Sequence, residues 1–165
     1  MTFSFIEEIL KNRFTGFLKM SELFYDSRSL PKTRGIYLVL YLADKSPEFM
    51  TIGTGGHFKG KDPNIAIAEL KKNWVDDAIV VYIGKAGKEG SSATLQSRLR
   101  QYFSFGKGGN VGHWGGRYIW QLRNSNELVV CWKELPEDDP RTVEADLIKK
   151  FITRYGKRPF ANLSD

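Results

Sequence analysis

Two apolar segments decide the fold: residues 35–43 read GIYLVLYLA, and residues 78–86 read AIVVYIGKA. Both are short runs of β-branched, aromatic and aliphatic residues, a composition typical of buried β-strands. Residues 127–135 (ELVVCWKEL) form a third run of this kind and predict a third strand. A weaker pattern over residues 48–52 predicts one more short strand between the first two. We therefore expect a small sheet at the centre of the molecule.

Helical patterns lie between and after these segments. Residues 65–74 predict a short helix, and a longer one is expected to follow a cap at Ser91 or Ser92. The last helix is expected to begin after Asp139, with a proline in its first turn, and to end at Gly156. Helices that alternate with a few strands predict a small α/β sandwich of the α+β class.

The chain of 165 residues is long enough for one domain with its own core, so we expect a single domain over residues 1–165. Residues 1–34 predict a peripheral, helical N-terminal extension. Residues 44–74 separate the first two strong strands and are interpreted as an insertion that serves recognition or dimerisation.

Positive charge is concentrated in one stretch of the chain. The formal net charge is +6, and residues 85–123 account for all of it, with seven lysines and arginines against Glu89. The same stretch contains six tyrosines, phenylalanines and tryptophans between its cations. Cations interleaved with aromatic rings are typical of proteins that bind a phosphate-bearing polymer, although a solvated basic face over an aromatic core gives a similar pattern.

Several classes of protein are excluded by the sequence. No apolar run approaches the roughly 20 residues of a membrane helix, and residues 1–10 lack the pattern of a signal peptide. The single cysteine, Cys131, has no internal disulfide partner. We therefore expect a cytoplasmic protein without a membrane partner. Residues 55–61 (GGHFKGK) match a phosphate-binding P-loop up to its lysine, but Asp62 stands where serine or threonine is needed, so we expect no nucleotide cofactor.

Two predicted helices each carry a charged residue beside their apolar face. Glu144 shares a helical face with Ile148, and Arg98 is next to Leu99. A carboxylate on a core-facing stripe is costly unless it is paired or binds a metal, and a guanidinium in such a place needs an anion. A salt bridge between the two helices would satisfy both charges, and so would a site for a metal and a phosphate.

These residues belong to five short motifs that occur in a fixed order. The motifs are GIY at 35–37, YIGKA at 82–86, LQSRLRQYF at 95–103, EADLIK at 144–149 and RPFAN at 158–162. Together they resemble the GIY-YIG nuclease superfamily, and in particular the nuclease module of excinuclease-type members. The resemblance covers residues 35–41 and 79–162.

The resemblance implies a DNA endonuclease that uses one divalent ion, Mg²⁺ or Mn²⁺, on a three-stranded antiparallel sheet flanked by helices. Glu144 would be the metal ligand, and Arg98 would hold the scissile phosphate. Tyr37 and Tyr82 would position or deprotonate the attacking water. The implied catalytic set is Tyr37, Tyr82, Lys85, Arg98, Tyr102, Glu144 and Asn162.

The residue types suit phosphodiester hydrolysis. A single carboxylate with waters and phosphate oxygens can hold Mg²⁺, and arginine binds phosphate through two hydrogen bonds. Tyrosine has an ordinary pKa of about 10, so a tyrosine base needs cations that stabilise its anion. We expect Lys85 and the metal to provide that stabilisation. Whether Tyr37 or Tyr82 is the base stays open.

Contacts to DNA outside this set are expected from the basic stretch. The expected residues are Lys88, Arg100, Lys107, His113 and Arg117. A non-catalytic nucleic-acid-binding module with the same fold is the alternative function. A structural core that pairs Arg98 with Glu144 is a third interpretation, and in that case Arg98→Ala would destabilise the fold. A homodimer is left open, because cutting both strands of DNA can require two active sites.

Overall fold

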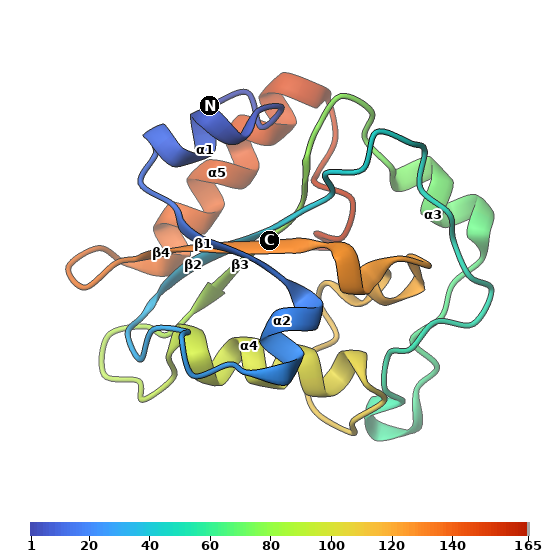
Figure 1. The fold of residues 1–165 in the computed structure, drawn as a ribbon, viewed down its shortest axis with the longest axis horizontal. Coiled ribbons are helices and arrows are strands. Elements are labelled where there is room, and N and C mark those ends of the chain that lie inside the picture. The colour runs from blue at the N-terminus through green and yellow to red at the C-terminus, as the bar shows by residue number, and fades with distance from the viewer. Residues whose placement is uncertain (165) are drawn as a thin grey trace.

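The computed structural model describes residues 1–164, and this part of the chain has an α+β fold around one antiparallel sheet of four strands (Figure 1). The strands are β1 (Thr15–Lys19), β2 (Gly35–Leu40), β3 (Val80–Ala86) and β4 (Val129–Glu134), in the order β1-β4-β2-β3. The helices are α1 (Ile6–Lys11), α2 (Met20–Tyr25), α3 (Ile67–Asn73), α4 (Leu95–Gly106) and α5 (Pro140–Tyr155). Short 3₁₀ turns are η1 (Phe58–Gly60), η2 (Arg117–Gln121) and η3 (Ser125–Glu127).

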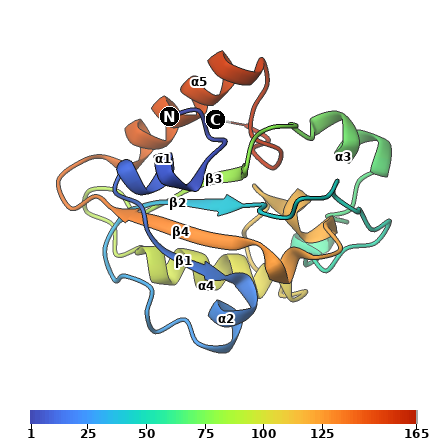
Figure 2. The same cartoon turned by 45° about the horizontal axis from the view of Figure 1, so that its top comes forward.

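Helices cover both faces of the sheet. Figure 2 shows α1 and α5 on one face and α2 and α4 on the other. Because side chains alternate along a strand, β2 sends Tyr37 and Val39 into the core under α4, and Ile36 and Leu38 into the core under α5. All six residues of β2 are buried, which explains why its sequence is apolar throughout.

The sheet has one strand more than the three that the resemblance implies. The additional strand, β1, pairs with β4 and lies inside the extension that was predicted to be only helical. Its backbone is irregular, because Gly16 and Phe17 have φ angles of 96° and 55° and the register shifts between Thr15 and Leu18. Such a segment lacks the alternation that reveals a strand in a sequence.

The N-terminal extension belongs to the core and is not peripheral. Phe3 and Ile9 are fully buried, and the Phe3 ring lies 5.1 Å from that of Phe151 on α5. The carbonyl of Phe3 also accepts a hydrogen bond of 2.9 Å from the amide of Ile79. These contacts attach the first residues of the chain to the layer that contains α5.

The insertion at residues 44–74 wraps around η2. The strand predicted at residues 48–52 is reduced to a single bridge between Phe49 and Leu122, whereas α3 forms close to where a helix was predicted. The buried side chain of Gln121 holds the insertion in place. Its Nε2 donates to the carbonyls of Met50 (3.1 Å) and Ile65 (2.9 Å), and its Oε1 accepts from the amide of Ile65 (2.9 Å).

Local signals at the helix ends explain where α4 and α5 begin. The α4 helix starts after Thr94, whose Oγ1 accepts from the amide of Ser97 (3.1 Å), and not after the serines predicted as caps. The α5 helix confirms the prediction, with Asp139 as its cap and Gly156 at its end. None of the helices within residues 1–164 is long and apolar enough to cross a membrane.

Gly84 on β3 leaves the space that the ring of Tyr37 occupies. The two residues are paired across β2 and β3, and the tyrosine ring lies directly over the glycine. A Cβ at Gly84 would be 2.3 Å from Cζ and 2.5 Å from the hydroxyl oxygen of Tyr37. Only a residue without a side chain therefore permits this packing.

We predict that Gly84→Ala lowers the free energy of unfolding by about 1–3 kcal/mol, because the added methyl group displaces the buried Tyr37 ring. Urea denaturation measures the change. Gly115→Ala is the matched control, because a Cβ there would have the Tyr82 hydroxyl as its nearest neighbour, at 3.9 Å. We expect that control to stay within about 0.5 kcal/mol of the wild type. Equal stability of the two variants would contradict the prediction.

Candidate active site

A cleft of about 1150 Å³ lies where β3, α4, α5 and the C-terminal residues 162–164 meet. Six of the seven residues in the predicted catalytic set line it, and they come from separate elements. These residues are Tyr37 on β2, Tyr82 and Lys85 on β3, Arg98 on α4, Glu144 on α5, and Asn162. The seventh, Tyr102, is fully buried and lies against both of the other tyrosines.

Three tyrosines form a compact cluster between the sheet and α4. The ring centroids of Tyr37 and Tyr82 are 6.0 Å apart, and Tyr102 lies 5.5 Å from Tyr82 and 6.4 Å from Tyr37. Tyr102 donates a 2.8 Å hydrogen bond to the carbonyl of Gly116, which anchors it. Tyr82 is 7% exposed and Tyr37 only 1%, so Tyr82 is the more accessible from the cleft.

Burial raises the pKa of all three hydroxyl groups. The pKa of Tyr82 rises to about 12, mainly through burial, and the Arg98 guanidinium opposes that increase. The pKa of Tyr37 lies well above its usual value, again through burial first, with the neighbouring tyrosines adding to the effect. Both tyrosines are therefore protonated at neutral pH, and Tyr82 is the easier of the two to ionise.

Arg98 is the cation that opposes the increase in the pKa of Tyr37 and Tyr82. The sequence had predicted Lys85 for this role. Lys85 is on β3, opposite Ile36, and so points to the sheet face that α5 covers. There its ammonium group forms an ion pair with the Glu144 carboxylate. The sequence could not give this partner, because it depends on how α5 packs against β3.

Arg98 does not form the salt bridge that a purely structural role would require. Its guanidinium donates a 3.2 Å hydrogen bond to the side chain of Gln101 one turn further along α4. None of the ion pairs formed within residues 1–164 includes Arg98. The interpretation that pairs Arg98 with Glu144 is therefore wrong for the described chain. The side chain is a half-buried cation on the wall of the cleft.

Asn162 braces β3 from its outer edge. Its Oδ1 accepts from the amide of Ile83 (2.9 Å), and its Nδ2 donates to the carbonyl of the same residue (2.8 Å). The amide of Ala161 adds a 2.9 Å bond to the carbonyl of Val81. A side-chain amide thus satisfies the backbone groups that another strand would satisfy, and it holds the segment that carries Tyr82.

His113 lies inside the tyrosine cluster, where it stacks on Tyr102 with ring centroids 4.2 Å apart. Its Nδ1 is 3.0 Å from the carbonyl of Gly115 and must donate to it, so Nε2 is the nitrogen that accepts from the Tyr37 hydroxyl (3.4 Å). Burial, with Arg98 adding to it, lowers the pKa of His113 to about 3. This position does not support the predicted DNA contact, because the ring does not reach the surface.

The other cations predicted to contact DNA lie in three different places. Lys88 lines the cleft. Arg100 and Lys107 belong to a second pocket on another side of α4. Arg117 is partly buried against the rings of Trp114 (4.6 Å) and Tyr118 (5.3 Å). The basic stretch of the sequence is therefore not one continuous surface.

Two further residues of the cleft, Gln101 and Arg141, were not singled out from the sequence. Each lies three positions from a predicted site residue: Gln101 from Arg98, and Arg141 from Glu144. Residues three apart share a helical face, and that spacing could have identified both.

A divalent ion would find one well-placed carboxylate in the cleft, that of Glu144. No group of three or more histidine, cysteine, aspartate or glutamate side chains suited to a metal exists among residues 1–164. Mg²⁺ commonly keeps several waters and takes one or two carboxylates with phosphate oxygens, so this oxygen donor fits Mg²⁺ or Mn²⁺ better than zinc. The Lys85 ammonium group is a direct competitor for the same carboxylate.

No protein-family model, no curated protein and no solved structure matches this chain. Its functional interpretation therefore rests on the residues of the cleft, on their geometry, and on the motifs that contain them.

We predict that the imidazole of His113 stays neutral between pH 8 and pH 5, because its pKa of about 3 lies below that range. NMR of a His57→Gln variant follows His113 as the remaining histidine, and its ring resonances should not shift. The unfolded chain takes up this proton below pH 6.5, so the free energy of unfolding should fall by about 1.4 kcal/mol per pH unit as the pH drops from 6.5 towards 3. A titration midpoint of His113 above pH 5 would contradict the buried geometry.

Proposed function

We propose that this protein is a divalent-metal-dependent endonuclease of the GIY-YIG type that hydrolyses phosphodiester bonds in DNA, with the cleft as its active site. The observation that carries the proposal is the cation of Arg98, which has no carboxylate partner within residues 1–164 and lines one cleft with two tyrosine hydroxyl groups and Glu144. A phosphate is the anion that these groups are suited to receive.

The architecture is compatible with this proposal. The strands β4, β2 and β3 would correspond to the three-stranded sheet that the resemblance implies, and β1 would be an addition at the outer edge of β4. Tyr37 and Tyr82 lie on neighbouring antiparallel strands and point to the same face. The two name-giving motifs are thus adjacent in space although 44–74 separates them in the sequence.

Arg98 would bind the scissile phosphate. Its guanidinium can give two parallel hydrogen bonds to phosphate oxygens, and the partly buried wall of the cleft makes those bonds stronger than they would be in water. In hydrolysis a water oxygen forms a bond to phosphorus, the bond from phosphorus to the leaving sugar oxygen breaks, and that oxygen takes a proton. Arg98 would stabilise the negative charge that builds up on the phosphate during this displacement.

Tyr82 would remove the proton from the attacking water. It is more exposed to the cleft than Tyr37, and a hydrogen bond between the two hydroxyl groups favours the ionised form of Tyr82 and disfavours that of Tyr37. Tyr37 would therefore donate to the Tyr82 oxygen once Tyr82 has lost its proton. While both tyrosines are neutral, the Tyr37 hydroxyl group donates a hydrogen bond to Nε2 of His113, which orients that hydroxyl group.

Glu144 would hold the metal ion, and the ion would supply positive charge next to the phosphate and the leaving oxygen. The Lys85 ammonium group would have to leave the carboxylate or share it. Freed from Glu144, Lys85 would contact the substrate from the β3 side of the cleft, which it lines.

We predict that purified protein nicks supercoiled plasmid in Mg²⁺ or Mn²⁺, and that Glu144→Gln, Arg98→Ala and EDTA each reduce the cleavage about 100-fold or more. Agarose gels measure the nicked and linear products. Glu89→Gln is the matched control, an acid of the same cleft that is exposed and should retain activity. Arg98→Ala should unfold at the wild-type temperature, because no ion pair described in residues 1–164 is lost.

Two outcomes would overturn this proposal. Cleavage that survives in Glu144→Gln would show that the carboxylate has another role. Plasmid that is retarded on a gel but never cut would favour the alternative, a non-catalytic nucleic-acid-binding module with the same fold.

We predict that the single-turnover cleavage rate rises about tenfold per pH unit between pH 6.5 and 9, because the pKa of Tyr82 is about 12 and its ionised fraction grows tenfold per unit below that value. Tyr82→Phe should lower the rate and flatten this dependence. Tyr37→Phe should lower the rate and keep the slope. If Tyr37→Phe is the variant with the flat profile, the roles of the two tyrosines are reversed.

A further inference from the structure

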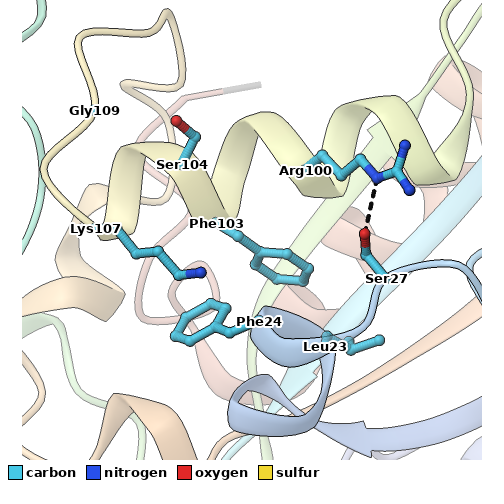
Figure 3. Close-up of a pocket in the computed structure, with 8 residues that line it drawn as sticks. All are labelled: Leu23, Phe24, Ser27, Arg100, Phe103, Ser104, Lys107 and Gly109. Carbon is cyan, nitrogen blue, oxygen red and sulfur yellow. Dashed lines mark hydrogen bonds between the residues drawn. The ribbon is translucent and has the colours of Figure 1, made fainter.

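A second pocket lies on the side of α4 opposite the active-site cleft. Arg98 and Arg100 are two positions apart on the helix and so project in nearly opposite directions. Arg98 lines the cleft, whereas Arg100 lines a pocket of about 390 Å³ between α4 and the N-terminal extension (Figure 3). The extension contributes Phe24 and Ser27 to this pocket, and Lys107 follows the end of α4.

The extension holds the two cations of this pocket through direct contacts to uncharged groups. Nε of Arg100 donates a 2.8 Å hydrogen bond to the hydroxyl of Ser27, as Figure 3 shows, which leaves the terminal nitrogens for another partner. Nζ of Lys107 lies 4.5 Å from the centre of the Phe24 ring. A hydroxyl group and an aromatic face hold a cation in position but carry no negative charge. Both side chains are exposed to solvent.

Several basic side chains on the surface are paired with acids. Lys19 pairs with Glu127, Lys150 with Asp146, and Arg28 with Asp26, each at 2.7 Å. Neither Arg100 nor Lys107 takes part in any ion pair formed within residues 1–164. Asp26 lies near enough to Arg100 to interact with it electrostatically, but its carboxylate is bound by Arg28 through two hydrogen bonds. The pocket therefore keeps two positive charges.

The surface of α4 between the cleft and the pocket is free of negative charge. The helix reads LQSRLRQYFSFG and contains no acidic residue. Its exposed positions between the two arginine sides are Ser97, Gln101 and Ser104, which are uncharged. An extended anion can lie across this face and reach Arg98 at one edge and Arg100 with Lys107 at the other. The rise of 1.5 Å per residue spaces Arg100 and Lys107 by about 10 Å along the helix, room for more than one phosphate.

We infer that this pocket, defined by Phe24, Ser27, Arg100 and Lys107, is a second phosphate-binding site that holds the DNA backbone beyond the bond that is cut. The N-terminal extension would then contribute to substrate binding by fixing one cation of α4 and one that follows its end. This inference rests on the proposed function, because the DNA in the pocket is the substrate of the cleft.

The affinity for a fluorescein-labelled 30-base-pair duplex in EDTA, measured by fluorescence anisotropy from 50 to 200 mM salt, tests this inference. Arg100→Ala/Lys107→Ala should bind at least tenfold more weakly at 100 mM salt. The slope of log affinity against log salt should fall by about 1.8, since each phosphate contact on duplex DNA contributes about 0.9. Both residues are exposed, and alanine favours the helix at position 100, so the variant should fold as the wild type does.

The matched control is Lys149→Ala/Arg154→Ala, which removes the same charge from exposed positions on α5, across the sheet from the pocket. We expect it to keep the wild-type salt slope and to bind within twofold of the wild type. Ser27→Ala should weaken binding less than the loss of Arg100, because it frees the guanidinium but retains its charge.

The outcomes separate this inference from the proposed nuclease function. If the wild-type protein cuts plasmid but the pocket variant binds the duplex like the α5 control, the inference about the pocket is wrong and the nuclease proposal stands. Wild-type protein that neither binds the duplex nor cuts plasmid would overturn both.

Discussion

The burial of three tyrosine rings between the sheet and α4 is the constraint on which the site depends. Tyr37 can lie there only because Gly84 has no side chain, and Tyr102 is anchored by the carbonyl of Gly116. Burial keeps these hydroxyl groups protonated and makes any ionisation costly. Arg98 is the cation that offsets this cost. In the proposed mechanism, the positive charge that eases the ionisation of Tyr82 is the same charge that would bind the phosphate.

Segments outside the motifs keep this cluster in place. The extension reaches α4 through Gln96, whose buried side chain donates to the carbonyl of Leu30 (3.2 Å). The insertion is tied to η2 by Gln121, directly after the loop that carries His113. Both segments are therefore part of the support for the tyrosines, and α2 in addition creates the second pocket. The cations of a stretch that is continuous in sequence are separated in space, because α4 presents Arg98 and Arg100 on opposite sides.

The pairing of Lys85 with Glu144 divides the charges of the cleft into two groups. The Glu144 carboxylate and the Lys85 ammonium group neutralise each other on the α5 side, whereas Arg98 on the α4 side forms no ion pair within residues 1–164. This asymmetry makes the cleft suited to an anion. A metal ion at Glu144 would release Lys85 and add further positive charge, and both changes favour a phosphate. The electrostatics of the proposed site therefore depend on contacts across two layers of the fold.

The sequence by itself determined the elements whose signals are local. Composition placed β2, β3 and β4, and the cap at Asp139 with the glycine at 156 placed α5. Helical spacing also showed that Arg98 and Glu144 face inward. Only the tertiary structure decided the rest. It showed β1, whose left-handed residues Gly16 and Phe17 hide the strand pattern, and it gave Glu144 the partner Lys85. It also buried His113, because the position of a glycine-rich loop is set by what it packs against and not by its own residues.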